Sequence, residues 1–213
     1  MSWTIVAFAL LTCLFVTSAA WAHGGQLFAN RVATAPTIDG SDDDAAWSSG
    51  FRYPFAFNQL KESDQTWTDL DDLSASFKLV YADNVLYGLV YRHDDITNTG
   101  NSAAHENDGV EIFFDFQHEG RSVTQVRALV GKPFAESVGG KAITSAWNDD
   151  GTILEFAIDL SAVGLTLERG TVIGFNIAIN DADEGLREIQ LYPFPGNNTS
   201  WNNANSLGHL QFN

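Results

Sequence analysis

The sequence contains almost no sulfur and few basic residues. Met1 and Cys13 are the single methionine and the single cysteine among 213 residues, and 11 lysines and arginines are outnumbered by 27 aspartates and glutamates. With one cysteine, the chain offers no cysteine zinc cluster and no iron–sulfur centre. The formal net charge of −16 repels nucleic acid and anionic lipid, so we expect neither as a partner. This charge suits a neutral ligand and leaves carboxylates for calcium, although an acidic surface also serves solubility.

The N-terminal stretch MSWTIVAFALLTCLFVTSAAWA is apolar and carries no charged side chain. It ends on Ala20-Trp21-Ala22, which fits the A-x-A pattern of a signal-peptide cleavage site. We therefore predict a signal peptide over 1–22 and a mature domain over 23–213 that is secreted or periplasmic and lacks sulfur. The alternative is an uncleaved membrane anchor, which would be the chain's one membrane contact, but the apolar run is short for a span of about 20 residues.

Strand-like segments recur at short spacing along the mature chain. Each shows alternation or β-branched and aromatic residues, and turn residues separate them. They cover 51–57, 74–82, 85–92, 110–116, 122–130, 141–147, 152–158, 171–180, 187–192 and 208–212. No segment keeps a helical period for three turns, and 42–47 and 159–164 fit single helical turns. The pattern predicts an all-β protein, a single-domain antiparallel β-sandwich of about ten strands and of immunoglobulin or jelly-roll type.

The two faces of the predicted strands differ in character. In the segment 171–180, one side is a continuous apolar row that would face the core. The opposite side is small and polar, and a ligand's hydroxyl groups could approach it. This opposite row consists of Gly174, Asn176, Ala178 and Asn180. Glu111 and Arg127 fall on the outward faces of two other strands, so Glu111, Arg127 and Asn176 are candidate ligand-binding residues. The alternative is that all three are ordinary solvent-facing side chains.

Trp201 lies in a loop of asparagine, serine and threonine residues, which is not a core environment. A flat indole covers the C–H face of a sugar ring, while carboxylate and guanidinium groups bind the hydroxyl groups at its rim. Trp201 is therefore a candidate platform for a sugar. Trp47 follows an acidic single helical turn, and we expect it in the core, closing one end of the sandwich.

Five stretches of the chain together resemble the family 9 carbohydrate-binding modules, which are found appended to xylanases and related polysaccharide-degrading enzymes. In chain order they are APTIDGSDDDAAW (35–47), FKLVYADNVLYGLVYRHDD (77–95), ENDGVEIFFDF (106–116), VIGFNIAINDADEGLRE (172–188) and SWNNANSLGHLQF (200–212). The resemblance spans nearly the whole mature chain. It implies a β-sandwich that binds oligo- or polysaccharides such as xylan and cellulose fragments without catalysis, and so supports carbohydrate catabolism.

The resemblance also suggests site residues. In the best-described members two tryptophans hold a sugar at the end of a chain while polar residues bind its hydroxyl groups. The second tryptophan matches Trp201, with Asn198 just before it as an auxiliary group, and the carboxylate and the arginine match Glu111 and Arg127. His105 stands in place of the first tryptophan.

A second departure is Ala178, which replaces a glutamine of the family. Because an imidazole covers less of a sugar ring than an indole does, we expect weak binding. A dissociation constant between millimolar and micromolar corresponds to about −4 to −8 kcal/mol.

The family's use of structural calcium directs attention to the acidic loops. Asp39 and Asp42 belong to one oxygen-rich loop, and Asp181 and Asp183 belong to another. Neither loop has EF-hand spacing, so a solvated acidic loop is the alternative to a calcium site.

Haem- and copper-binding relatives of the same fold are a further alternative. The haem-binding members commonly use an axial methionine, and none follows the leader, so we expect no haem. Cleavage after Ala22 would leave His23 as the amino terminus, where amine and imidazole together can chelate copper.

Catalysis is not expected from this chain. Glu111 with Glu155 or Asp115 could form a carboxylate pair for glycoside hydrolysis. However, nothing in the sequence around them would raise one pKa selectively, and the resemblance is to a binding module. We expect a stand-alone module that acts beside a glycoside hydrolase in trans. The alternative from a different class is a structural or partner-binding sandwich with a degenerate sugar site.

Overall fold

The computed structural model describes residues 25–59, 70–183, 185–195 and 199–213. The predicted signal peptide, His23 and Asn198 lie outside these ranges. No helix within them is long and apolar enough to cross a membrane.

Strands and short 3₁₀ helices form all the regular elements of the described chain. The strands are β1 (Gln26–Arg31), β2 (Tyr53–Pro54), β3 (Phe57–Asn58), β4 (Leu73–Ala82), β5 (Val85–Asp94), β6 (Gly109–Asp115), β7 (Thr124–Leu129), β8 (Ser137–Val138), β9 (Lys141–Ala142), β10 (Thr144–Trp147), β11 (Ile153–Asp159), β12 (Val172–Asp181), β13 (Ile189–Tyr192) and β14 (Gly208–Phe212). The 3₁₀ helices are η1 (Ala45–Ser49), η2 (Ala104–Glu106), η3 (Leu160–Val163) and η4 (Ala204–Ser206).

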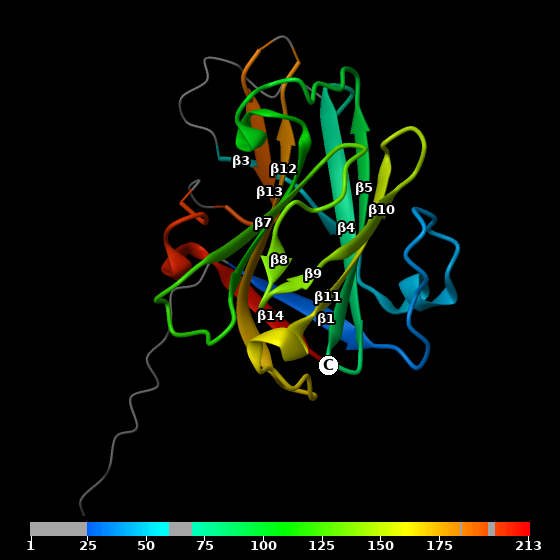
Figure 1. Cartoon of the computed structure of the whole chain (residues 1–213), viewed down its shortest axis with the longest axis vertical. Coiled ribbons are helices and arrows are strands. Elements are labelled where there is room, and N and C mark those ends of the chain that lie inside the picture. The colour runs from blue at the N-terminus through cyan, green and yellow to red at the C-terminus, as the bar shows by residue number, and fades with distance from the viewer. Residues whose placement is uncertain (1–24, 60–69, 184, 196–198) are drawn as a thin grey trace, which may run out of the picture.

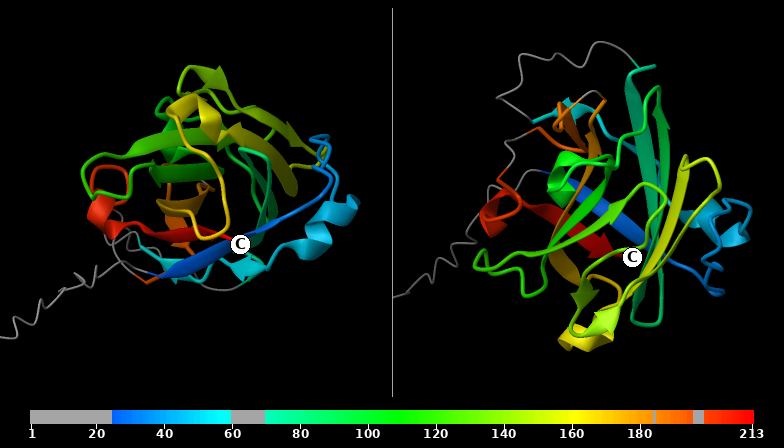
Figure 2. Two further views of the ribbon diagram at one scale, coloured as in Figure 1. Left: turned by 90° about the horizontal axis from the view of Figure 1, so that it is seen from below. Right: turned by 45° about the horizontal axis from the view of Figure 1, so that its top comes forward.

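The strands form two layers that β1 joins (Figure 1). In one layer β7, β6 and β12 pair in that order, and the far edge of β12 pairs with β14 and then with β13, which pairs with β3. In the other, β10, β11, β5 and β4 pair in that order, with β2 against β4. β1 pairs with β14 through its first residues and with β4 through its last two. The view from below in Figure 2 shows the strands enclosing a common centre.

The predicted all-β sandwich is confirmed, and the differences lie at its edges. Both pairings of β1 are parallel, whereas the other described pairings are antiparallel. The sequence did not predict β1 or the two-residue strand β8. The predicted strand over 51–57 is divided into β2 and β3, because the chain crosses here from β4 in one layer to β13 in the other.

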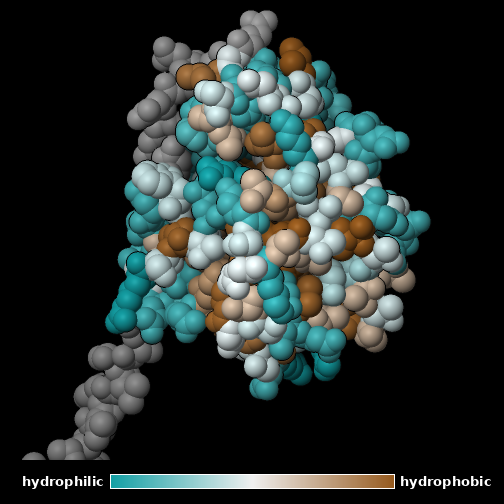
Figure 3. All heavy atoms as spheres, in the orientation of Figure 1, coloured by the Kyte–Doolittle hydropathy of each residue, from teal (hydrophilic) through white to brown (hydrophobic). Residues whose placement is uncertain are grey.

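The inner faces of the two layers form the core. The predicted apolar row of β12 is completely buried, and the inward residues of β6 and most of those of β4 are buried as well. The row comprises Ile173, Phe175, Ile177 and Ile179. The visible face in Figure 3 is different, with apolar groups scattered among hydrophilic ones.

Two smaller apolar clusters lie on the outer faces of the layers. Trp47 is 1% exposed, and it packs with Val80 and Leu89 on the outside of β4 and β5. Trp47 is thus buried, but the prediction that it closes one end of the sandwich is wrong. On the other layer, Phe113 packs with Tyr192. Together with Ala178 and Leu207 they cover part of the outer face of β6 and β12. The alternation had suggested that this whole face is open to solvent, and that is not the case.

Candidate functional site

A pocket of about 370 Å³ opens on the outer face of the layer that contains β6, β7 and β13. Its walls combine aromatic rings with charged and amide side chains. They are His105, Glu111, Phe113, Gln125, Arg127, Arg187, Gln190, Tyr192 and Trp201. Such a mixture of apolar surface and convergent polar groups is typical of small-molecule sites.

Strand pairing brings four of the predicted ligand-binding residues into this pocket. Glu111 of β6 lies directly opposite Arg127 of β7 in the antiparallel register. His105 comes from η2, and its side chain is 47% exposed. Trp201 comes from the loop before η4, and it is 59% exposed although it is a large aromatic residue. His105 and Glu111 are six residues apart, whereas Arg127 and Trp201 join them because β6 and β7 pair beside the C-terminal loop.

The carboxylate of Glu111 is buried at the base of the pocket and is held by amide groups. Its Oε1 accepts a hydrogen bond from Asn180 at 3.2 Å, and its Oε2 accepts from Gln125 at 3.1 Å and from Gln190 at 3.4 Å. Burial raises the pKa of Glu111, and the nearby guanidinium of Arg187 and the Asn180 amide oppose that rise. Both oxygens of Glu111 are therefore already engaged by hydrogen bonds from the protein.

The two guanidinium groups of the pocket have different partners. Arg127 donates to Glu136 through Nε at 3.0 Å and Nη2 at 2.9 Å, so its charge is balanced beside the pocket rather than by Glu111. Nη1 of Arg187 lies 4.0 Å from Oε1 of Glu111 and 3.4 Å from the Asn180 side-chain oxygen. The contacts of the Arg187 guanidinium with described residues are therefore long, while its backbone N–H donates to Glu106 at 2.9 Å.

Asn176 does not line the pocket. It is 3% exposed, and its amide nitrogen donates to Oγ of Ser200 at 3.1 Å. Ser200 is also buried, and it precedes Trp201 in the chain. The physical reason is that the C-terminal loop folds over this part of β12, so Asn176 anchors the loop that carries Trp201 instead of reaching a ligand itself.

Several pocket residues were not predicted from the sequence. In β13 the alternation of Ile189 and Leu191 with Gln190 and Tyr192 is a two-residue pattern that places the last two on the outer face. The sequence therefore contained a signal that places Gln190 and Tyr192 on the outer face. Arg187 has no such signal, because it lies in the loop between β12 and β13 and reaches the pocket only through the path of the backbone.

The proposed carboxylate pair for hydrolysis does not form. Glu155 is on β11 in the opposite layer, where its carboxylate accepts from Trp47 and from two backbone N–H groups. Asp115 accepts from the backbone N–H of Gly120. Of the three carboxylates, Glu111 alone lines the pocket, so both pairings of Glu111, with Glu155 and with Asp115, are wrong.

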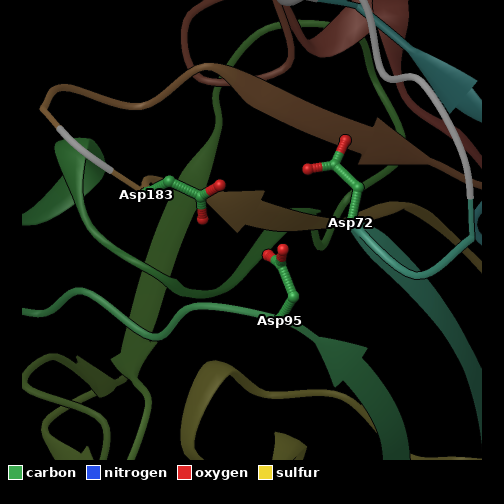
Figure 4. A group of neighbouring side chains, drawn as sticks. All are labelled: Asp72, Asp95 and Asp183. Atoms are coloured by element: carbon green, nitrogen blue, oxygen red, sulfur yellow. The ribbon is translucent and has the colours of Figure 1, made fainter.

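A separate cluster of carboxylates lies where β4 begins and where β5 and β12 end. Two groups of three have carboxylate oxygens that all lie within 4.8 Å of one another. One is Asp72, Asp95 and Asp183, whose side chains point toward one another in Figure 4, and the other is Asp94, Asp181 and Asp183. The structure therefore brings the predicted residues Asp181 and Asp183 together with carboxylates from two other chain segments.

Arg92 contacts Asp94 and balances part of the charge of this cluster, and the remaining carboxylates fit a cation. Asp181 is 0% exposed, and neither of its oxygens has a hydrogen-bond partner within the described ranges. Burial and then the neighbouring carboxylates raise the pKa of Asp181 to about 8 and that of Asp183 to about 6. Buried carboxylates without donors are costly, and hard divalent cations such as Ca²⁺ are bound by such oxygen sets.

Asp39 and Asp42 lie elsewhere and belong to neither group in the described chain. Oδ2 of Asp42 accepts from the Tyr91 hydroxyl at 3.0 Å, and Oδ1 of Asp39 accepts from the N–H of Ser41 at 3.0 Å. These carboxylates stabilise the segment before η1, so the structure separates the two pairs of aspartates that the sequence had offered as calcium ligands.

Comparisons with known proteins agree with the fold and with the resemblance. The family model described as "Carbohydrate family 9 binding domain-like" matches residues 38–213. The exoglucanase XynX of Acetivibrio thermocellus is 28% identical over 197 residues, which are 84% of this chain and 17% of that enzyme. The endo-1,4-beta-xylanase A of Thermotoga maritima is 28% identical over 196 residues, 84% of this chain and 18% of that enzyme. The chain therefore spans less than a fifth of the length of these two relatives.

A solved structure shows the same architecture. A family 9 carbohydrate-binding module from Caldicellulosiruptor kristjanssonii, in complex with cellotriose, has a TM-score of 0.72 and 24% sequence identity, and the match covers 88% of this chain and 93% of that one. This likeness concerns the fold. Because the family model covers most of the sequence, the chain belongs to the family 9 carbohydrate-binding domain-like proteins, which are binding domains and not catalytic ones.

Proposed function

We propose that the chain binds carbohydrate non-catalytically in the pocket beside Trp201. One observation carries this proposal: the indole of Trp201 is 59% exposed beside a pocket that is lined by buried amide and carboxylate groups and by partly buried guanidinium groups. An exposed indole supplies a flat apolar surface for the C–H face of a sugar ring, while fixed polar groups recognise its hydroxyl groups. Family membership and the cellotriose complex of the structural neighbour support this class of ligand.

The ligands that we propose are fragments of plant polysaccharides of the xylan or cellulose type. The curated relatives support this choice, since the regions that match this chain belong to proteins named as an exoglucanase and an endo-1,4-beta-xylanase. We further propose that the chain is exported and acts beside a glycoside hydrolase in trans. The apolar N-terminal stretch supports the first of these statements.

Calcium is the second component of the proposal. Asp94, Asp181 and Asp183 would hold it, because their oxygens lie close together and those of Asp181 have no donor in the described part of the chain. Such an ion neutralises buried charge and fixes the ends of β5 and β12. Its role would be structural, and the residues of the pocket bind the sugar.

Isothermal titration calorimetry with xylo- and cello-oligosaccharides tests the proposal. Trp201→Ala should weaken binding at least about tenfold, equivalent to about 1.4 kcal/mol, because the sugar ring loses the apolar surface that the indole provides. Phe51→Ala is the matched control, since Phe51 is also an exposed aromatic residue, at 52%, and does not line the pocket. Unchanged affinity in Trp201→Ala, or an equal loss in both variants, contradicts the assignment of the site.

A further inference from the structure

The pocket offers a ligand more hydrogen-bond donors than acceptors. Three side-chain amides already donate to the carboxylate of Glu111, so its oxygens have little capacity left. The side-chain oxygen of Gln190 accepts from the Tyr192 hydroxyl at 3.1 Å. The main acceptors at the base of the pocket are therefore occupied by the protein's own donors.

The donors of Arg187 are in the opposite situation. Its side chain is 13% exposed, and Nε is buried and has no acceptor within the described chain. Among the described residues, the contacts of Nη1 are the long ones to Asn180 and Glu111, at 3.4 Å and 4.0 Å. A guanidinium removed from water with unpaired N–H groups carries a substantial desolvation cost, which a bound acceptor would offset.

The pocket is less acidic than the chain as a whole. The formal net charge is −16, yet the pocket is lined by two arginines and a single carboxylate. Two hydrogen bonds from the Arg127 guanidinium to Glu136 neutralise its charge. Glu111 instead accepts hydrogen bonds from three side-chain amides and lies 4.0 Å from the guanidinium of Arg187. Among the described residues, Arg187 is therefore the cation of the pocket whose contact with a carboxylate is long, at 4.0 Å from Glu111.

We propose that the preferred ligand is an acidic sugar, a uronic acid residue whose carboxylate binds Arg187 while Trp201 covers the ring. A carboxylate is an acceptor-only group, and the planar fork of an arginine matches its two oxygens. The inference rests on the proposed carbohydrate-binding function and specifies the substrate class for the same pocket.

The overall negative charge of the protein opposes an anionic ligand only weakly at close range. At physiological ionic strength, exposed charges more than about 8 Å apart are largely screened from each other. A contact with a partly buried guanidinium is screened much less. The local pairing therefore dominates the free energy of binding, while the net charge slows the approach of the ligand.

Calorimetric titrations with matched sugars test the proposal. The probes are methyl β-D-glucuronide against methyl β-D-glucoside, and methyl β-D-galacturonide against methyl β-D-galactoside, since each pair differs only in the group at C6. The wild-type protein should bind at least one uronide about tenfold more tightly than its neutral counterpart, which corresponds to a free-energy difference of about 1.4 kcal/mol. Raising the salt concentration should reduce this preference.

Two arginine variants and one control identify the residue. Arg187→Gln should bring the preference to about one, and Arg187→Lys, which keeps the charge without the fork, should retain part of it. Arg121→Gln removes the same charge from a side chain that is 80% exposed and does not line the pocket, and it should keep the full preference. Thermal unfolding of each variant establishes that it is folded.

Each result has a distinct meaning. If the neutral sugars bind and no uronide is preferred, or if a preference persists in Arg187→Gln, the inference is overturned while the proposed function stands. If none of the four sugars and no longer oligosaccharide binds, both are overturned.

Discussion

Glu155 provides a sharp test of how the N-terminal part of the domain is held in place. Its carboxylate is completely buried and accepts three hydrogen bonds. Oε2 accepts from the backbone N–H groups of Asp39 and Gly40 at 2.9 Å each, and Oε1 accepts from the indole of Trp47 at 2.8 Å. Gly40 has φ of +87°, a conformation that favours glycine, so this turn is shaped to present its N–H to the carboxylate.

The expected magnitude follows from these three donors. Glu155→Ala leaves the N–H groups of Asp39, Gly40 and Trp47 without their acceptor, and each buried donor left unpaired costs about 1–3 kcal/mol. Because the N–H of Asp39 is only partly buried, water can satisfy it in the variant. We therefore expect a loss of about 3–5 kcal/mol in the free energy of unfolding, which is a large part of the ~5–15 kcal/mol typical of a domain.

Urea denaturation followed by far-ultraviolet circular dichroism measures this loss. Trp47→Phe removes a single donor and should cost less than Glu155→Ala. The control Glu119→Ala removes a carboxylate that is 53% exposed, and it should change the free energy of unfolding by less than about 0.5 kcal/mol. A loss below about 1 kcal/mol in Glu155→Ala would refute this account.

Three further predictions concern the cation, the loop and a surface ion pair. Calcium should raise the unfolding temperature of the chelator-treated wild-type protein, measured by calorimetry, and should not raise that of Asp181→Asn. At a free calcium concentration one hundred times the dissociation constant, the expected stabilisation of the wild-type protein is about 2.7 kcal/mol. Asn176→Ala should weaken oligosaccharide binding by about 2- to 10-fold in titration calorimetry, because Ser200 loses a hydrogen bond that positions the Trp201 loop. Lys141→Met should raise the pKa of Asp159 from about 2 toward its ordinary value in an NMR titration, because the ammonium that donates to this carboxylate is removed.

The sign of the last effect is fixed by the direction of the pKa shift. Because the pKa of Asp159 is lowered in the folded state, its stabilising contribution is present above the ordinary aspartate pKa and is lost as the pH falls through about 2. A pKa that stays near 2 in Lys141→Met contradicts this cause. Equal calcium stabilisation in Asp181→Asn, or full affinity in Asn176→Ala, contradicts the other two predictions.

The sequence predicted the fold well because the inner faces of the strands follow a strict two-residue period. The row from Ile173 to Ile179 was predicted to face the core, and it is completely buried there. The outer faces were harder to predict, because loops distant in sequence cover them. Asn176 has the pattern of an exposed residue but lies beneath Ser200, and Glu155 has the pattern of a surface carboxylate but serves as the acceptor for Trp47.

Charged residues of the site were predictable only where a strand fixes their direction. Glu111 and Arg127 were identified by alternation, and their cross-strand pairing follows from the register of β6 and β7. The contact of Arg127 with Glu136 and the position of Arg187 depend on loop paths, which periodicity does not encode. The same limit applies to the acidic cluster, where Asp181 meets carboxylates from the ends of other strands.

The most direct test of the central claim is an NMR titration of ¹⁵N-labelled protein with xylo-, cello- and uronate-containing oligosaccharides. The account predicts that the indole N–H of Trp201 and the side-chain amides of Gln125 and Gln190 shift most, while the indole of Trp47, buried on the other layer, does not shift. Shifts that leave Trp201 unchanged, or that centre on Trp47, would contradict the claim that this pocket binds carbohydrate.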